Sequence, residues 1–187
     1  MLPPRPTELA HHLVCQALCV GDLAIDATAG NGHDTLMLAE RVGESGRVLA
    51  FDVQAAAIEA ARARIAAAGF ESRVDFHHAS HARMAEFAAP EAAAAVMFNL
   101  GYLPGGDHHL TTDSSETLRA LEAAATCLKP GGILTVVCYP GHPAGAVEAS
   151  AVENWLQARC SDGWRLAKYV MLGTRDPAPF LLTASRH

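Results

Sequence analysis

The stretch DATAGNGHDTLMLAERVG, residues 26–43, places Gly30 and Gly32 between a short apolar run and an amphipathic pattern. The run LAIDATA at 23–29 predicts a buried strand, and the segment that starts at Asp34 predicts a helix. A glycine turn between a strand and a helix is typical of a nucleotide or dinucleotide site. The N-terminus of a helix attracts phosphate, but a carboxylate there, such as that of Asp34, repels it. The acidic turn therefore favours a cationic cofactor over one that carries phosphate.

Strand and helix patterns alternate along the rest of the chain. Apolar runs predict strands at 46–53, 73–80, 93–105 and 133–139, and two more within 164–185. Helical spacing predicts helices at 7–19, 54–69, 82–89, 113–128 and 144–160, and it places Leu9, His12, Leu13 and Gln16 on one face of the first. KPGG at 129–132 predicts a turn. The alternation predicts an α/β fold in which residues 1–187 form a single domain around a doubly wound, seven-stranded, mostly parallel sheet with an antiparallel C-terminal edge.

The composition is typical of a soluble globular protein. Half of the 187 residues are apolar, and the net charge of −6 with a pI near 5.9 gives no overall attraction for nucleic acid. No apolar run approaches the roughly 20 residues that span a bilayer, so we expect no membrane segment. Five cysteines without a CxxC pair indicate free thiols in a reducing compartment. We therefore expect a cytoplasmic protein.

Ligands of doubly wound sheets bind at the carboxyl ends of the strands. Asp52 ends the second predicted strand about twenty residues after Gly32, where its carboxylate can accept both hydroxyls of an adenosine ribose. S-adenosylmethionine (SAM) carries a sulfonium and an ammonium but no phosphate, so Asp26 and Asp34 favour SAM. An NAD-linked oxidoreductase and a non-catalytic nucleotide-binding module remain alternatives. The predicted cofactor contacts are Asp26, Thr28, Gly30, Asn31, Gly32, Asp34, Thr35, Asp52, Val53, Gln54, Ser80, His81 and Asn99.

The segment NLGY at 99–102 follows the fourth predicted strand of the repeating pattern. Enzymes that methylate amino groups carry an Asn/Asp-Pro-Pro-Tyr loop there, in which the polar oxygen orients the amine and the aromatic ring stacks on the base. Asn99 and Tyr102 occupy these two places and are the predicted catalytic residues. After the fifth of these strands, His142 is the candidate proton acceptor because a histidine titrates near neutral pH, and Tyr139 could shape the same pocket.

Histidines gather at two places, His77, His78 and His81, and His108 with His109. No cysteine accompanies them and their spacing matches no zinc template. We therefore predict no metal site.

The segments AIDATAGNGHDT, AFDVQ, FNLGYLPGGDH and YPGHPAG together resemble the small class I methyltransferases labelled rRNA methylases. The resemblance extends from about Thr7 to Ala184, and NLGYLPG and YPGHP are its most specific parts. Members of this family methylate the aminomethyl group of 5-aminomethyl-2-thiouridine at the wobble position of tRNA. The resemblance thus implies SAM as cofactor, a tRNA anticodon loop as substrate and a homodimer. The residues alone leave rRNA or a small molecule open as the substrate.

Overall fold

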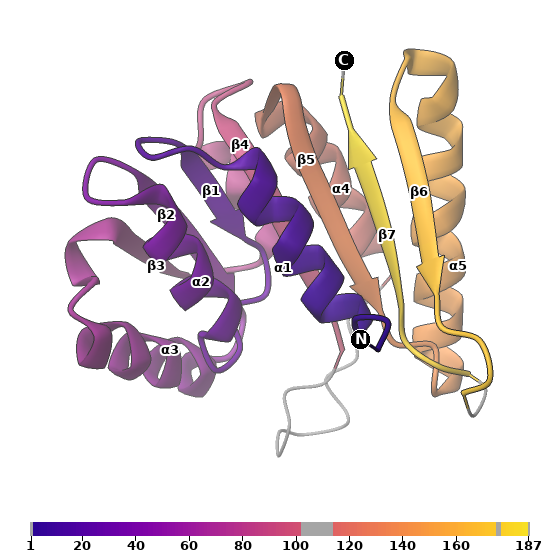
Figure 1. Cartoon of the computed structure of the whole chain (residues 1–187), viewed down its shortest axis with the longest axis horizontal. Coiled ribbons are helices and arrows are strands. Elements are labelled where there is room, and N and C mark those ends of the chain that lie inside the picture. The colour runs from indigo at the N-terminus through magenta and orange to yellow at the C-terminus, as the bar shows by residue number, and fades with distance from the viewer. Residues whose placement is uncertain (1, 102–113, 175–176, 187) are drawn as a thin grey trace.

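The computed structural model describes residues 2–101, 114–174 and 177–186 of the chain. Seven strands form one sheet in the order β3-β2-β1-β4-β5-β7-β6, in which β7 runs in the opposite direction to the other six (Figure 1). The strands are β1 (Leu23–Asp26), β2 (Arg47–Asp52), β3 (Val74–His78), β4 (Ala93–Leu100), β5 (Leu128–Cys138), β6 (Arg165–Val170) and β7 (Phe180–Ser185). The predicted mostly parallel, seven-stranded sheet is therefore confirmed.

Helices cover both faces of this sheet (Figure 1). The α-helices are α1 (Pro6–Ala17), α2 (His33–Val42), α3 (Ala55–Ala68), α4 (Ser114–Cys127) and α5 (Pro143–Ala158). The 3-10 helices are η1 (Glu71–Arg73), η2 (His81–Glu86) and η3 (Arg159–Asp162). Helices α1, α2 and α3 pack on one face, whereas α4, α5 and η2 pack on the other.

The central strands β1, β2, β4 and β5 are largely buried on both faces because successive side chains point to opposite sides of the sheet. In β1, Ala24 belongs to the core under α1 to α3, and the next residue, Ile25, belongs to the core under α4 and α5. In β2, Ala50 likewise belongs to the core under α1 to α3, and Phe51 belongs to the core under α4 and α5. This double burial explains why the strand sequences are continuous apolar runs.

The structure differs from the sequence prediction at three local features. Helix α2 begins at His33 rather than at Asp34, and Gly32 is its N-cap with a left-handed φ of 78°. KPGG at 129–132 lies inside β5 as an irregularity, because Ala93 pairs with Leu128 while Ala95 already pairs with Ile133. The segment predicted as a helix at 82–89 is the 3-10 helix η2.

The buried stripe of α1 also differs from the predicted one. Pro6, Ala10 and Val14 face the sheet, whereas His12 is exposed. Ala10 and Val14 are fully buried in the core on this face, and Leu9 and Leu13 pack partly buried against the same core. This rotation turns His11 toward α2, and its consequence for the site is described below.

Candidate functional site

A cavity of about 510 Å³ opens at the carboxyl ends of β1, β2, β4 and β5. Most residues predicted from the sequence line it, namely Thr28, Gly30, Asn31, Asp34, Asp52, Val53, Gln54, Ser80, His81, Asn99, Tyr139 and His142. Asp26, Gly32 and Thr35 do not line the cavity, and Tyr102 lies outside the described residues. The fold thus gathers residues from four strand ends into one site.

The glycine turn is shaped by a close approach to α3. A Cβ atom on Gly32 would lie 2.8 Å from the Cα of Ala61, and the φ of 78° also disfavours a side chain. Arg64 of α3 donates through Nε to the carbonyl oxygen of Asn31 at 2.6 Å, and its Nη2 lies 3.1 Å from His33 Nε2. Sequence reasoning missed Arg64, which holds the turn in place from a different helix.

Asp52 is held at the end of β2 by two backbone amides. Gly30 N–H donates to Asp52 Oδ2 at 2.9 Å, and Gln54 N–H donates to Oδ1 at 2.9 Å. Each carboxylate oxygen accepts more than one hydrogen bond, so both keep capacity for the two hydroxyls of a ribose. This arrangement agrees with the ribose-binding role predicted for Asp52.

Asp26 supports the turn from beneath the cavity. Its side chain is fully buried, and it accepts bonds from Thr28 N–H at 3.1 Å and from the Thr35 hydroxyl at 2.5 Å. Burial, with the nearby charge of Asp34, raises the pKa of Asp26 to about 7 despite these two bonds. Asp26 therefore acts on a cationic ligand through the turn that it supports, and not by direct contact.

Asp34 lies at the wall of the cavity and joins two elements. His11 Nε2 of α1 is 2.6 Å from Asp34 Oδ1, and Asn99 Nδ2 is 3.4 Å from Asp34 Oδ2. The bond to Asp34 raises the pKa of His11, although partial burial opposes this. The sequence pointed to Asp34 but not to His11, which lies 23 positions away.

Asn99 is the penultimate residue of β4 and lines the cavity beside Asp34. Its backbone N–H donates to Thr28 Oγ1 at 2.8 Å. Because the ionised carboxylate of Asp34 only accepts hydrogen bonds, the amide group of Asn99 must turn its Nδ2 toward Asp34. The Oδ1 atom of Asn99 is buried and has no hydrogen-bond partner among the described residues. A buried acceptor of this kind is rare and costly, so it marks a place for a donor from a ligand.

Tyr139 packs against the chain just after Asn99. A Cβ atom on Gly101 would lie 3.0 Å from the Tyr139 ring, so a glycine lets the ring close over the end of β4. Burial raises the pKa of Tyr139, and the charge of Asp34 adds to this, whereas a bond from Asn99 opposes it. The phenol therefore stays protonated at neutral pH.

His142 is the N-cap of α5. Its Nδ1 accepts a hydrogen bond from Gly145 N–H at 3.0 Å, which satisfies one of the free amides of the first turn. To accept a proton at Nδ1, the ring would have to give up this cap. Because Nδ1 accepts this bond with its lone pair, a neutral ring carries its proton on Nε2, and Nδ1 is the nitrogen that can take up a second proton. The role of His142 as proton acceptor stays a prediction.

The far wall of the cavity is also acidic, which the sequence did not indicate. Glu116 accepts a bond from the Ser80 hydroxyl, and the buried Glu148 accepts one from Thr117 Oγ1 at 2.6 Å. His81 is buried beside them with Nδ1 3.1 Å from the carbonyl oxygen of Ala27, and burial lowers its pKa. His81 is therefore neutral at physiological pH.

The charge of the cavity lining separates two classes of cofactor. Four carboxylates line it, those of Asp34, Asp52, Glu116 and Glu148, and none of the described lining residues is Lys or Arg. The pyrophosphate of a dinucleotide would meet repulsion without a compensating cation. The two positive groups of SAM fit this lining.

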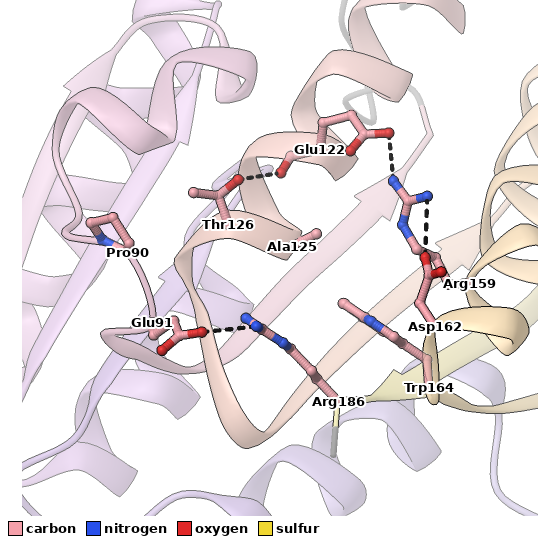
Figure 2. A pocket seen from close by; sticks show the side chains of 9 residues that line it. All are labelled: Pro90, Glu91, Glu122, Ala125, Thr126, Arg159, Asp162, Trp164 and Arg186. Carbon is pink, nitrogen blue, oxygen red and sulfur yellow. Dashed lines mark hydrogen bonds and ion pairs between the residues drawn. The ribbon is translucent and has the colours of Figure 1, made fainter.

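A second cavity of about 510 Å³ lies near the amino ends of the parallel strands, at the opposite end of the sheet from the first cavity (Figure 2). Its acidic residues are paired with arginines: Glu91 with Arg186 at 2.8 Å and Glu122 with Arg159 at 2.6 Å. Asp162 lies 4.0 Å from the same Arg159. Each of these acids lies within 4.0 Å of an arginine of the protein itself, so none is left to act on a cationic ligand.

The described residues include no group of three or more His, Cys, Asp or Glu side chains placed to hold a metal. His77 packs between Phe51 and Phe87, and His78 Nε2 lies 3.0 Å from the carbonyl oxygen of Val53. His108 and His109 lie outside the described residues. No helix in the described parts is long and apolar enough to cross a bilayer.

Comparisons with known proteins give the same assignment as the geometry. The family model described as "Putative rRNA methylase" matches residues 48–185. A chloroplastic tRNA (mnm(5)s(2)U34)-methyltransferase from Arabidopsis thaliana is 40% identical over 188 residues, which cover 95% of this chain and 68% of the relative.

Solved structures agree over the full chain. A protein from Clostridium thermocellum described as a "putative rRNA-methylase" has a TM-score of 0.95 and 33% identity, with 100% of both chains covered. A "putative methyltransferase" from Streptococcus mutans in complex with S-adenosylhomocysteine (SAH) has a TM-score of 0.90 and 30% identity, again with 100% of both chains covered. The chain therefore belongs to the family described as "Putative rRNA methylase" and is a SAM-dependent methyltransferase of class I fold.

Proposed function

We propose that this enzyme transfers a methyl group from SAM to the aminomethyl nitrogen of 5-aminomethyl-2-thiouridine at the wobble position of tRNA. The name of the Arabidopsis relative supports this substrate. The observation in the site that carries the proposal is the buried Asn99 Oδ1, which has no partner among the described residues. A primary amine supplies the N–H donor that this oxygen needs, and the hydrogen bond aims the nitrogen lone pair.

Each wall of the cavity then has a distinct task. Asp52 accepts the ribose hydroxyls, and Asp34 attracts the positive groups of the cofactor. Val53, Gln54, Ser80 and His81 line the part of the cavity beyond Asp52, where we place the adenine. When bound, SAM supplies a methyl group on a positively charged sulfur, so the protein has to provide alignment more than strong acid or base.

The acceptor nitrogen must be neutral to act as a nucleophile. A cationic cofactor beside it lowers the pKa of an ammonium group, as does exclusion of water. The proton leaves to water or to a side chain, and His142 is our candidate acceptor through Nδ1, which must first release its bond to Gly145 N–H. Tyr102 is proposed to stack on the extruded base, which is worth about 1–3 kcal/mol per base in comparable cases. Tyr102→Ala should therefore weaken use of tRNA while SAM binding is kept.

The net charge of −6 means that tRNA must be held by a local basic surface. A second copy of the chain would enlarge the surface available for this contact, and we propose a cytoplasmic homodimer. Light scattering of the purified protein at several concentrations tests the dimer, and a monomer throughout would contradict it.

The substrate is tested by methyl transfer to two matched tRNA preparations. One carries 5-aminomethyl-2-thiouridine and the other already carries the terminal methyl group. The proposal predicts transfer to the first only, with the methylated nucleoside identified by mass spectrometry. Nucleoside analysis of tRNA and rRNA from a deletion strain provides the second arm. A missing methyl group in rRNA, with the tRNA nucleoside unchanged, would contradict the tRNA assignment and favour the rRNA alternative.

A further inference from the structure

His11 contacts the methyl-transfer site without lining its cavity. The His11 side chain is 34% exposed, and its Nε2 lies 2.6 Å from Asp34 Oδ1, whose own side chain is 13% exposed. A neutral imidazole must carry its proton on Nε2 here, because a lone pair facing the carboxylate would be repelled. His11 therefore donates to Asp34 whether it is neutral or charged.

The same carboxylate sets the orientation of Asn99. Asp34 Oδ1 is occupied by His11, which leaves Oδ2 directed at Asn99 Nδ2 at 3.4 Å. Tyr139 also bonds to the Asn99 side chain, but Asp34 is the charged acceptor toward which Nδ2 turns. The unpartnered Oδ1 of Asn99 stays available only while its Nδ2 is engaged.

We propose that His11 is a positioning residue for methyl transfer: it fixes the Asp34 carboxylate, which in turn keeps Asn99 Oδ1 turned toward the acceptor amine. The inference rests on the proposed function, since it assumes that an amine binds at Asn99. It adds a residue from α1, which lies outside the strand ends that form the cavity (Figure 1).

The surroundings of His11 support a lasting bond to Asp34. The carboxylates that act on His11 are Asp34 of α2, Asp26 of β1 and Glu8 of its own helix. All three raise the pKa of His11, with the bond to Asp34 contributing most. Protonation strengthens the contact because a charge-assisted hydrogen bond is stronger than a neutral one.

A double-mutant cycle tests the inference in the full-length enzyme. His11→Ala should lower kcat for the aminomethyl tRNA by about tenfold, within the hundredfold that a misplacement of about 1 Å can cost. The dissociation constant of SAM should stay near the wild-type value. In an Asn99→Ala background, His11→Ala should cause no further loss, because the group that it positions is already absent.

Two variants of the same helix serve as controls. His11→Gln places an amide N–H near the position of Nε2 and should recover most of the lost kcat. His12→Ala removes the neighbouring histidine, which is exposed and hydrogen-bonded to the Gln16 side chain of its own helix, and should keep wild-type kcat. A loss of kcat of the same factor with and without Asn99 would overturn the inference, as would an unchanged kcat in His11→Ala or a loss of SAM affinity in place of kcat.

An NMR measurement keeps the inference testable if the substrate is wrong. The side-chain NH₂ signals of Asn99, identified by their absence in Asn99→Ala, should move in His11→Ala and stay in place in His12→Ala. Wild-type enzyme that ignores the aminomethyl tRNA would contradict the proposed function alone. Unmoved Asn99 signals in His11→Ala would overturn the positioning role, whatever the substrate.

Discussion

The two ends of β1 place an aspartate in opposite surroundings. At the amino edge of the sheet, Asp22 accepts bonds from Lys129 Nζ at 2.7 Å and from Cys19 N–H at 2.8 Å. Burial alone would raise the pKa of Asp22, but these partners outweigh it and hold the pKa below its ordinary value. At the carboxyl edge, Asp26 has only uncharged donors, and burial raises its pKa to about 7.

The acids of the two cavities differ in the same way, although each cavity has a volume of about 510 Å³. Acids at the amino edge are paired with arginines, whereas Asp52 and Glu148 at the carboxyl edge accept bonds from amides and a hydroxyl. Glu116 and Asp34 are the exceptions, since Glu116 also contacts the exposed Arg119 and Asp34 pairs with His11. Paired acids stabilise the fold, while acids left with neutral donors keep a field that a cationic ligand can use. Cavity size alone would not have distinguished the site.

The largest effect is expected from a pair of glycines on the two edges. Gly32→Ala places a side chain at left-handed φ and against Ala61, and should lower the free energy of unfolding by about 2–5 kcal/mol. Gly131 has a similar φ of +77° at the amino edge but no atom within 4 Å of an added Cβ. Gly131→Ala should therefore cost only about 1–2 kcal/mol. Urea unfolding measures the loss of stability in both variants. Equal losses would show that the close contact between Gly32 and Ala61 of α3 does not constrain the turn.

The two aspartates of β1 should give opposite pH dependences, each of a few kcal/mol at most. Folded Asp26 keeps its proton up to about pH 7, whereas an unfolded aspartic acid loses it near pH 4. Between these values the folded state binds more protons, so this contribution to stability falls as pH rises. Asp26→Asn should remove that fall in urea unfolding between about pH 4 and pH 7.

Asp22 acts with the reverse sign because its folded pKa is lowered. Its contribution is present above the unfolded pKa of about 4 and is lost as pH falls through the folded value. Asp22→Asn should therefore destabilise the protein at neutral pH and matter less in acid. If Asp26→Asn and Asp22→Asn changed the pH dependence of the unfolding free energy in the same direction, the difference described between the two ends of β1 would be wrong.

A smaller effect is expected on cofactor affinity. Asp52→Ala removes the acceptor for the ribose hydroxyls and should weaken SAM binding by about 1–3 kcal/mol. Glu122→Ala at the amino edge removes a carboxylate of the other cavity and should leave SAM affinity unchanged. Calorimetric titration of both variants decides the matter, and unchanged affinity in Asp52→Ala would refute its assignment.

Much of the fold follows from local patterns in the sequence. Apolar runs and helical spacing are properties of neighbouring residues, so the seven strands and the order of elements could be predicted. The insertion of β7 between β5 and β6 could not, because it depends on which sheet edge the last strand meets. KPGG was misjudged for a related reason: the pairing of Leu128 with Ala93 keeps the segment within the strand.

Site residues near strand ends could be predicted from the sequence, whereas those contributed by helices could not. Asp52 and Asn99 lie at or next to the ends of strands and could be found from their position alone. His11, Arg64 and Glu148 contact residues 23 to 33 positions away, and no local spacing signals such a contact. His11 could have been found only from the correct buried stripe of α1, in which Ala10 and Val14 face the sheet.

The central claim is that Asn99 at the carboxyl edge orients an amine for methyl transfer. Its most direct test is the rate of methyl transfer by Asn99→Ala to tRNA that carries 5-aminomethyl-2-thiouridine, measured beside a SAM titration of the same variant. The account predicts a fall of about a hundredfold or more with near-normal SAM affinity, as for loss of other positioning groups. Transfer at the wild-type rate would contradict it, because the buried Asn99 Oδ1 would then have no part in the reaction.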